Sequence, residues 1–185
     1  MIHKNLTHPL PQVELTSFHC AMKTLLILRH AKAEDAAPGQ SDFERVLKDR
    51  GRDQARAIGL FIKERMLNID LLLCSTAARA KETAEIVMVA ATSNADRRTE
   101  AQLYEASSLQ LFDLIVNLSD SASALLIVGH NPGLEDLVHL LSDRTCQLET
   151  CSLARIEIDA DSWGDLAEVS GKLDWVVNSQ DLLDE

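Results

Sequence analysis

Short runs of aliphatic residues alternate along this chain with longer segments whose apolar residues recur every three or four positions. The runs at 25–28 and 125–128 are wholly aliphatic, and the segment at 69–75 contains three consecutive leucines at 71–73. Such runs are typical of strands inside a parallel sheet that helices cover on both faces. Helical spacing predicts helices at 51–66 and 78–91, after Ser107, and from Pro132 onward with Asn131 as N-cap. The pattern therefore predicts an α/β fold, a three-layer sandwich with a mostly parallel central sheet flanked by helices.

The last third of the chain has a different pattern. Residues 153–158 and 172–177 alternate in polarity and flank turn residues at 162–165, which predicts a hairpin added to the edge of the sheet. Earlier in the chain, the polar segment 94–100 predicts a loop that leads into a short strand near Tyr104.

The length and the periodicity together indicate a single folded domain. A chain of 185 residues supports one substantial core. We expect that domain at 22–178, where the strand and helix patterns lie. Residues 1–21 have no periodicity and are expected to form a poorly ordered extension, and residues 179–185 a C-terminal tail.

Composition narrows the range of partners. The formal net charge is −11, which argues against binding to nucleic acids or to anionic membranes in general. An anion site in such a protein requires a local concentration of Arg and His. The four cysteines are irregularly spaced and no apolar stretch reaches membrane-spanning length, so we expect a cytoplasmic protein with free thiols.

Two of the aliphatic strands end on histidine. Arg29-His30 follows the first run, and Gly129-His130 follows the run at 125–128. Because the carboxyl ends of parallel strands form the ligand crevice of such sheets, we expect the two imidazoles to converge. Arg79 lies in the first turn of the helix after the strand at 69–75, where the helix N-terminus already favours an anion. These residues predict a phosphate site in which His30 is the nucleophile.

Two other chemistries compete with this interpretation. Cys74 and Arg79 suggest the loop of a cysteine phosphatase, but that loop needs one more intervening residue and glycines that wrap the anion. A metal site built from His30, His130, Glu34 and Asp35 is conceivable, but no metal-binding spacing supports it. We therefore expect no metal and no cofactor.

Three motifs in order resemble the histidine phosphatase superfamily, which has the phosphoglycerate-mutase-like fold. They are Arg29-His30, the segment 75–84 that contains Arg79, and Gly129-His130-Asn131-Pro132. Chain length and the segments 43–51 and 103–107 are most similar to the small SixA-like phosphohistidine phosphatases. The resemblance covers about residues 22–178. One departure is Ala31, where the superfamily usually has glycine.

The resemblance implies a mechanism. His30 accepts the phosphoryl group, Arg29, Arg79 and His130 hold its oxygens, and water then hydrolyses the phosphohistidine. Asn131 is a further candidate for substrate binding. The larger members carry a glutamate as general acid, a place that Glu105 fills approximately.

The substrate expected from this resemblance is a phosphorylated histidine of another protein. The leaving imidazole needs less protonation than an alkoxide, so an approximately placed acid favours a nitrogen–phosphorus substrate. The alternative is a phosphomonoesterase or mutase that acts on a small phosphorylated metabolite. A binding module without catalysis is disfavoured, because Arg29, His30, Arg79 and His130 are all present.

Overall fold

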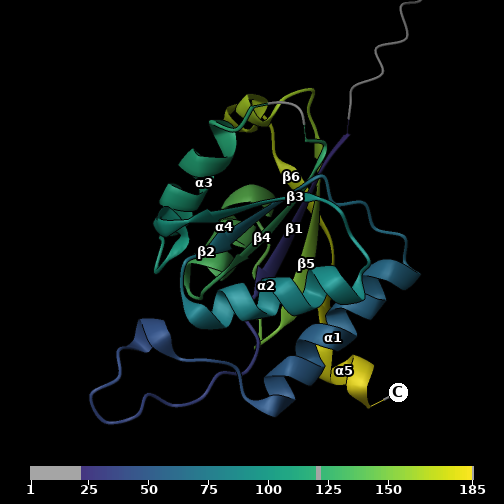
Figure 1. Ribbon diagram of the computed structural model, residues 1–185. Helices are drawn as coiled ribbons and strands as arrows, with labels where there is room; N and C mark the ends of the chain where they lie inside the picture. Colours follow the sequence, from purple (N-terminus) through teal and green to yellow (C-terminus); the bar gives the residue numbers. More distant parts are fainter. Residues whose placement is uncertain (1–21, 120–121, 185) are drawn as a thin grey trace, which may run out of the picture.

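The computed structural model describes residues 22–119 and 122–184. Within these residues, six strands form one sheet in the order β3-β2-β4-β1-β5-β6 (Figure 1). Neighbours among the first four strands of this order are parallel, β5 is antiparallel to β1, and β6 is antiparallel to β5. The strands are β1 (Met22–Arg29), β2 (Leu71–Ser75), β3 (Asp96–Glu100), β4 (Ala124–Gly129), β5 (Ser152–Asp159) and β6 (Gly171–Asn178). The predicted mostly parallel sheet and its edge hairpin are confirmed.

Helices cover both faces of the sheet, as Figure 1 shows. One face carries α1 (Asp49–Glu64), α2 (Ala78–Ala90) and α5 (Ser179–Leu183), and the other carries α3 (Ser108–Val116) and α4 (Gly133–Ser142). Short 3₁₀ helices occur at η1 (Asp42–Glu44), η2 (Ala101–Leu103) and η3 (Trp163–Ala167). The three-layer arrangement predicted from the sequence is therefore correct.

Alternate side chains of β1 divide the core into two layers. Leu26 and Leu28 pack toward α1 and α2, whereas Leu25 and Ile27 pack toward α3 and α4. All four side chains are completely buried. Each contributes about 1.5–3 kcal/mol relative to an exposed position. A strand buried on both faces needs apolar residues at every position, which is why its sequence is a continuous aliphatic run.

One predicted element is wrong. The segment 96–100 is not a loop but the edge strand β3, and Tyr104 does not lie in a strand but directly follows η2. β3 pairs with β2 through its backbone, and its side chains are mostly exposed. Because no side chain of this strand enters the core, the sequence has no alternation of polarity that could reveal it.

The C-terminal segment is also more ordered than expected. Residues 179–183 form α5, and its Gln180 Oε1 accepts a hydrogen bond of 2.6 Å from Arg50 Nη2 of α1. Leu182 packs against the core layer beneath α1. The domain therefore continues through α5. The expectation for residues 1–21 concerns residues outside those described.

Helix α4 begins one residue later than predicted. Its N-cap is Pro132, not Asn131, and Gly133 is its first residue. The Asn131 side chain donates instead to the carbonyl of Leu148, on a neighbouring loop. Among the described residues, no helix is both long and apolar enough to span a membrane.

Candidate active site

The carboxyl ends of β1, β4 and β2 meet at one edge of the sheet. In the register of these strands, Arg29 lies beside Gly129, and Val128 lies beside Cys74. His30 directly follows β1 and His130 directly follows β4, and the centroids of their rings lie 5.1 Å apart. The structure therefore brings the two histidines together, as their positions after the strands predict.

Arg79 lies between the two imidazoles. Its Nε–H donates to Nε2 of His30 over 3.2 Å, and its Nη2 donates to Nδ1 of His130 over 3.3 Å. The side chain is only 6% exposed. One edge of the guanidinium thus faces a nitrogen atom of each ring.

The tautomer of His30 follows from its backbone contact. Nδ1 lies 2.8 Å from the carbonyl oxygen of Ala31, which can only accept, so Nδ1 carries the proton and Nε2 keeps its lone pair. Thr83 fixes this backbone because its Oγ1 accepts from the Ala31 N–H and donates to the Arg79 carbonyl. Burial lowers the pKa of His30 to about 3. His30 is therefore a neutral imidazole with a lone pair directed into the site.

His130 has the opposite tautomer. Its Nδ1 accepts from Arg79, so Nε2 carries the proton and donates to Oγ of Ser75 over 2.8 Å. Burial also lowers the pKa of His130, to about 4. The ring of Tyr104 packs edge-on against His130, with centroids 5.5 Å apart. The second imidazole is thus neutral and held from three sides.

Arg29 and Asn131 share one acceptor. The carbonyl oxygen of Leu148 accepts from Arg29 Nη1 over 2.8 Å and from Asn131 Nδ2 over 3.0 Å. The Leu148 N–H in turn donates to a carboxylate oxygen of Glu135 in α4 over 2.6 Å. Within the described part of the chain, Arg29 Nε and Asn131 Oδ1 are buried without a hydrogen-bond partner. The charge of Arg29 contributes to the lowered pKa of both His30 and His130.

A carboxylate that the sequence did not indicate also reaches the site. Asp42 accepts from Arg79 twice, through its backbone oxygen at 2.7 Å and through Oδ2 at 2.8 Å. Ser75 and Tyr104, which contact His130, were likewise missed as site residues. Ser75 follows Cys74 at the end of a strand, a position that could have indicated it. Asp42 begins the short helix η1 within a polar segment that has no periodicity. The only local signal was Arg45 three residues later, which could have indicated an ion pair but not a contact with Arg79.

Glu105 forms no hydrogen bond with either histidine. It follows Tyr104, has a positive φ of 51°, and is exposed. Among the described residues it makes no hydrogen bond or ion pair. The adjacent carbonyl of Ala106 lies so close to Gly133 that a Cβ there would overlap it, which fixes this segment against α4. Glu105 thus lies beside the site without being held in it.

The two competing chemistries find no support in the geometry. Burial raises the pKa of Cys74 to about 12, so its thiol stays protonated within the core layer beneath α1 and α2. Glu34 and Asp35 both pair with Lys48, and Asp35 is almost fully exposed. Across residues 22–119 and 122–184, no group of three or more His, Cys, Asp or Glu is arranged to hold a metal ion.

The site combines one imidazole lone pair with donors that converge on the same space. Neutral His30 supplies the lone pair, and the guanidinium edge of Arg79 supplies two donors. Such an arrangement suits a tetrahedral oxyanion, because arginine forks match its oxygen atoms and its central atom faces the free nitrogen.

Comparisons with known proteins point to one family. Residues 25–112 match the family model of the histidine phosphatase superfamily, branch 1. An uncharacterised protein of Mycobacterium tuberculosis is 33% identical over 116 residues, which cover 62% of this chain and 70% of the relative. The segment that the family model matches contains most of β1, His30 directly after it, and the helix that carries Arg79.

Two solved structures share the fold. A candidate phosphohistidine phosphatase SixA from Agrobacterium tumefaciens is 28% identical, with a TM-score of 0.73 over 84% of this chain and 97% of that one. A candidate phosphohistidine phosphatase SixA from Nakamurella multipartitia has a TM-score of 0.75 and 24% identity, over 85% of this chain and 96% of that one. From the family model, the relative and the shared fold, it follows that this chain belongs to the histidine phosphatase superfamily, branch 1, and resembles its SixA-like members.

Proposed function

We propose that this protein is a phosphohistidine phosphatase that passes the phosphoryl group through His30. The single observation that carries this proposal is the placement of Arg79, which donates to Nε2 of His30 and to Nδ1 of His130 from one guanidinium edge. A phosphoryl group bound to that edge has its phosphorus next to the His30 lone pair. The similarity to the SixA protein of Agrobacterium tumefaciens supports the same substrate class.

The first step is attack by Nε2 of His30 on phosphorus. A nitrogen–phosphorus bond forms as the bond to the substrate imidazole breaks. The electron pair of the broken bond stays on the substrate ring, which is protonated on its other nitrogen and therefore leaves as neutral imidazole. The Nδ1–H···O hydrogen bond to Ala31 keeps the ring oriented while its other nitrogen carries the phosphoryl group. Arg79 exchanges its contact with His30 for phosphoryl oxygens, and Arg29 adds a second positive charge.

The second step is hydrolysis. The oxygen of a water molecule attacks phosphorus, the His30–phosphorus bond breaks, and its electron pair returns to Nε2. The water proton leaves with phosphate or passes to solvent. The approach of a phosphate dianion raises the pKa of His130, which then protonates at Nδ1 and donates to a phosphoryl oxygen. Arg29 and Asn131 both donate to the Leu148 carbonyl, and we expect both side chains to bind phosphoryl oxygens as well.

The position of Glu105 favours a nitrogen–phosphorus substrate over an ester. Glu105 is exposed and, among the described residues, makes no hydrogen bond that would hold it as a general acid. Departure of an alkoxide depends on such an acid for about 10²–10⁴-fold of its rate, whereas imidazole is a much weaker base and departs more readily.

A substrate panel tests the proposed function. We expect kcat/KM for a protein phosphorylated on histidine to exceed that for an alkyl phosphate, a sugar phosphate and a phosphoglycerate by about 10² or more. A higher value for one of the metabolites would show that the protein is a small-molecule phosphomonoesterase or mutase instead. His30→Ala is the matched inactive control on every substrate.

Two further properties are part of the proposal. The reaction needs no metal ion, so activity should survive a strong chelator. Loss of activity with the chelator and its recovery with a divalent ion would contradict this.

The protein acts in the cytoplasm, in line with the free thiols of Cys74, Cys146 and Cys151.

A further inference from the structure

We propose that Asp42 is a positioning residue that turns the phosphate-binding edge of Arg79 toward the two histidines. This inference rests on the phosphate site of the proposed function. Asp42 itself does not touch the phosphoryl group.

The guanidinium of Arg79 has two edges with different partners. The side edge, made by Nε and Nη2, faces His30 and His130. The end, made by Nη1 and Nη2, faces Asp42, whose backbone oxygen binds Nη1 and whose Oδ2 binds Nη2. Because Asp42 binds only the end, a phosphate can bind the side edge without displacing it. Two contacts at one end of a planar group also define its orientation.

Asp42 is itself held by several groups. Its Oδ1 accepts from Arg45 over 2.6 Å, and its Oδ2 accepts from the Tyr104 hydroxyl over 3.2 Å as well as from Arg79. The hydrogen bond from Arg45, with smaller contributions from Arg79 and Tyr104, lowers the pKa of Asp42 to about 2. The carboxylate is therefore charged and oriented at any physiological pH.

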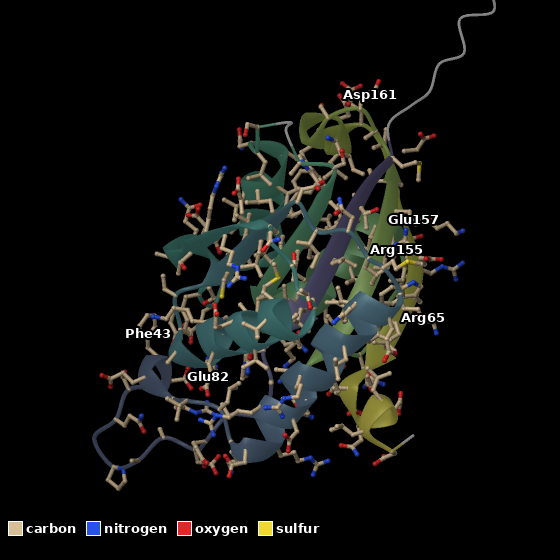
Figure 2. All side chains as sticks on the ribbon, turned by 45° about the vertical axis from the view of Figure 1, so that its right-hand side comes forward. Phe43, Arg65, Glu82, Arg155, Glu157 and Asp161 are labelled. Atoms are coloured by element: carbon tan, nitrogen blue, oxygen red, sulfur yellow. The ribbon has the colours of Figure 1, made fainter. Side chains whose placement is uncertain are left out.

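The loop that carries Asp42 is attached to the same helix as Arg79. At its base, the Glu34 N–H donates to the Val46 carbonyl over 2.8 Å. The Leu47 N–H donates to Glu82 of α2 over 2.9 Å. Figure 2 shows Glu82 and Phe43, the neighbour of Asp42, on the same side of the molecule. The loop and Arg79 thus form one unit around the first two turns of α2.

A different role for Asp42 has to be separated from this one. A carboxylate beside Arg79 could compete with phosphate for the guanidinium and so inhibit the empty enzyme. Removing the charge would then strengthen the binding of oxyanions, whereas a positioning role requires that it weaken their binding. The sign of this change distinguishes the two roles.

The experiment compares Asp42→Asn with Asp35→Asn. Asp35 is a control in the same loop, because it is exposed and its ion-pair partner is Lys48. Tungstate and vanadate serve as probes, with inhibition constants measured beside thermal melting. We expect Asp42→Asn to weaken oxyanion binding about 10-fold or more, because a charged hydrogen bond is lost, and to lower the melting temperature only slightly, because the Asp42 side chain is 44% exposed. Asp35→Asn should leave both quantities unchanged.

A double-mutant cycle tests whether Asp42 acts through Arg79. In an Arg79→Lys background, Asp42→Asn should have little further effect on tungstate affinity, measured by calorimetry. Arg45→Gln removes the ion pair with Oδ1 of Asp42. It should weaken tungstate binding by a smaller factor than Asp42→Asn does, and it replaces that variant if Asp42→Asn fails to fold.

Three results would overturn the positioning role: tighter oxyanion binding, unchanged binding with a lower melting temperature, or a full effect in the Arg79→Lys background. None of these depends on which substrate is hydrolysed. If the wild-type protein bound tungstate normally but did not hydrolyse phosphohistidine, the proposed function would be wrong and the positioning role of Asp42 would stand.

Discussion

Arg79 and Arg155 are both arginines with acidic partners, but their surroundings differ. Arg155 lies on β5, 27% exposed, and pairs with Glu157 and Asp174 at 3.0 and 3.2 Å. Figure 2 shows Arg155 and Glu157 on the side of the molecule opposite Phe43 and Glu82. Arg79 is 6% exposed and has one carboxylate, Asp42, and two neutral imidazoles as partners.

The difference separates a structural ion pair from an anion site. Two carboxylates more than balance the charge of Arg155. A partly exposed pair of this kind contributes about 0–1 kcal/mol to stability. The side edge of Arg79 ends on uncharged nitrogen atoms, so its two N–H donors remain available to an incoming anion. Whether an arginine can bind a phosphoryl group is thus indicated by the charge of the groups that accept its hydrogen bonds, more than by how deeply the side chain is buried.

The largest expected effect comes from removing each arginine in turn. Arg79→Ala should lower kcat/KM by about 10³ or more on every substrate, because it deletes donors that stabilise charge in the transition state. Arg155→Ala should change kcat/KM less than about 3-fold and stability by about 1 kcal/mol at most. Steady-state kinetics and urea unfolding measure the two quantities. Similar losses of activity in both variants would remove the distinction between the two arginines.

Glu105→Gln is expected to have a smaller effect that depends on the leaving group. If Glu105 donates a proton, hydrolysis of an alkyl phosphate should slow by about 10², the lower end for acid catalysis, since Glu105 is exposed. Hydrolysis of phosphohistidine should slow much less. The ratio of the two kcat/KM losses is the quantity to measure, because it cancels general damage.

Equal and severe losses of kcat/KM on both substrates would instead indicate that the substitution disturbs the segment around Ala106, which packs against Gly133. No loss on either substrate would show that Glu105 is only a solvated acid of the loop.

The third prediction concerns the neutral partners of Arg79. Burial lowers the pKa of His30 to about 3 and that of His130 to about 4, whereas both rings of an unfolded chain protonate near pH 6.5. As the pH falls below 6.5, the unfolded state binds protons that the folded state does not. Stability is therefore lost from about pH 6.5 down to about pH 4 for His130 and down to about pH 3 for His30, by up to about 1.4 kcal/mol per pH unit for each ring.

Ring ¹⁵N chemical shifts of the free protein measure this directly. At about pH 5.5 we expect both rings to be neutral, with the proton on Nδ1 of His30 and on Nε2 of His130. Protonation of either ring near pH 6.5 would mean that Arg79 faces a cation, which contradicts the comparison with Arg155.

The smallest expected effect on activity is that of Cys74→Ser. The thiol lies in the core layer beneath α1 and α2, and its Sγ donates to the Ser75 carbonyl, so it does not face the histidines. We expect kcat/KM to stay within about 2-fold of the wild type, with a loss of stability of about 1–3 kcal/mol from the buried hydroxyl. Loss of turnover in a folded variant would revive the thiolate mechanism.

The sequence predicted those site residues whose positions follow from regular structure. His30 and His130 end buried strands, and Arg79 begins a helix, so hydrophobic periodicity alone places them at one edge of the sheet. Asp42 reaches Arg79 from a loop whose path depends on long-range contacts such as that between Leu47 and Glu82. No local pattern encodes such a path.

The same reason explains the errors in the fold. β3 is held by backbone hydrogen bonds to β2 and has polar side chains, so its residues resemble those of a loop. The helix at 179–183 is short and is held by tertiary contacts such as that with α1, and its five residues are too few to display a period. Elements that bury a full face were predicted, whereas those that depend on a neighbour were not.

Trapping of the phosphoenzyme tests the central claim most directly. The protein is mixed with a ³²P-phosphohistidine substrate, quenched within one turnover, and assayed for bound label at acid and alkaline pH. We predict label that is acid-labile and alkali-stable, located at His30, and absent from the His30→Ala variant. Label retained in His30→Ala, or a wild-type enzyme that turns over without any labelled intermediate, would contradict the assignment of His30 as the nucleophile.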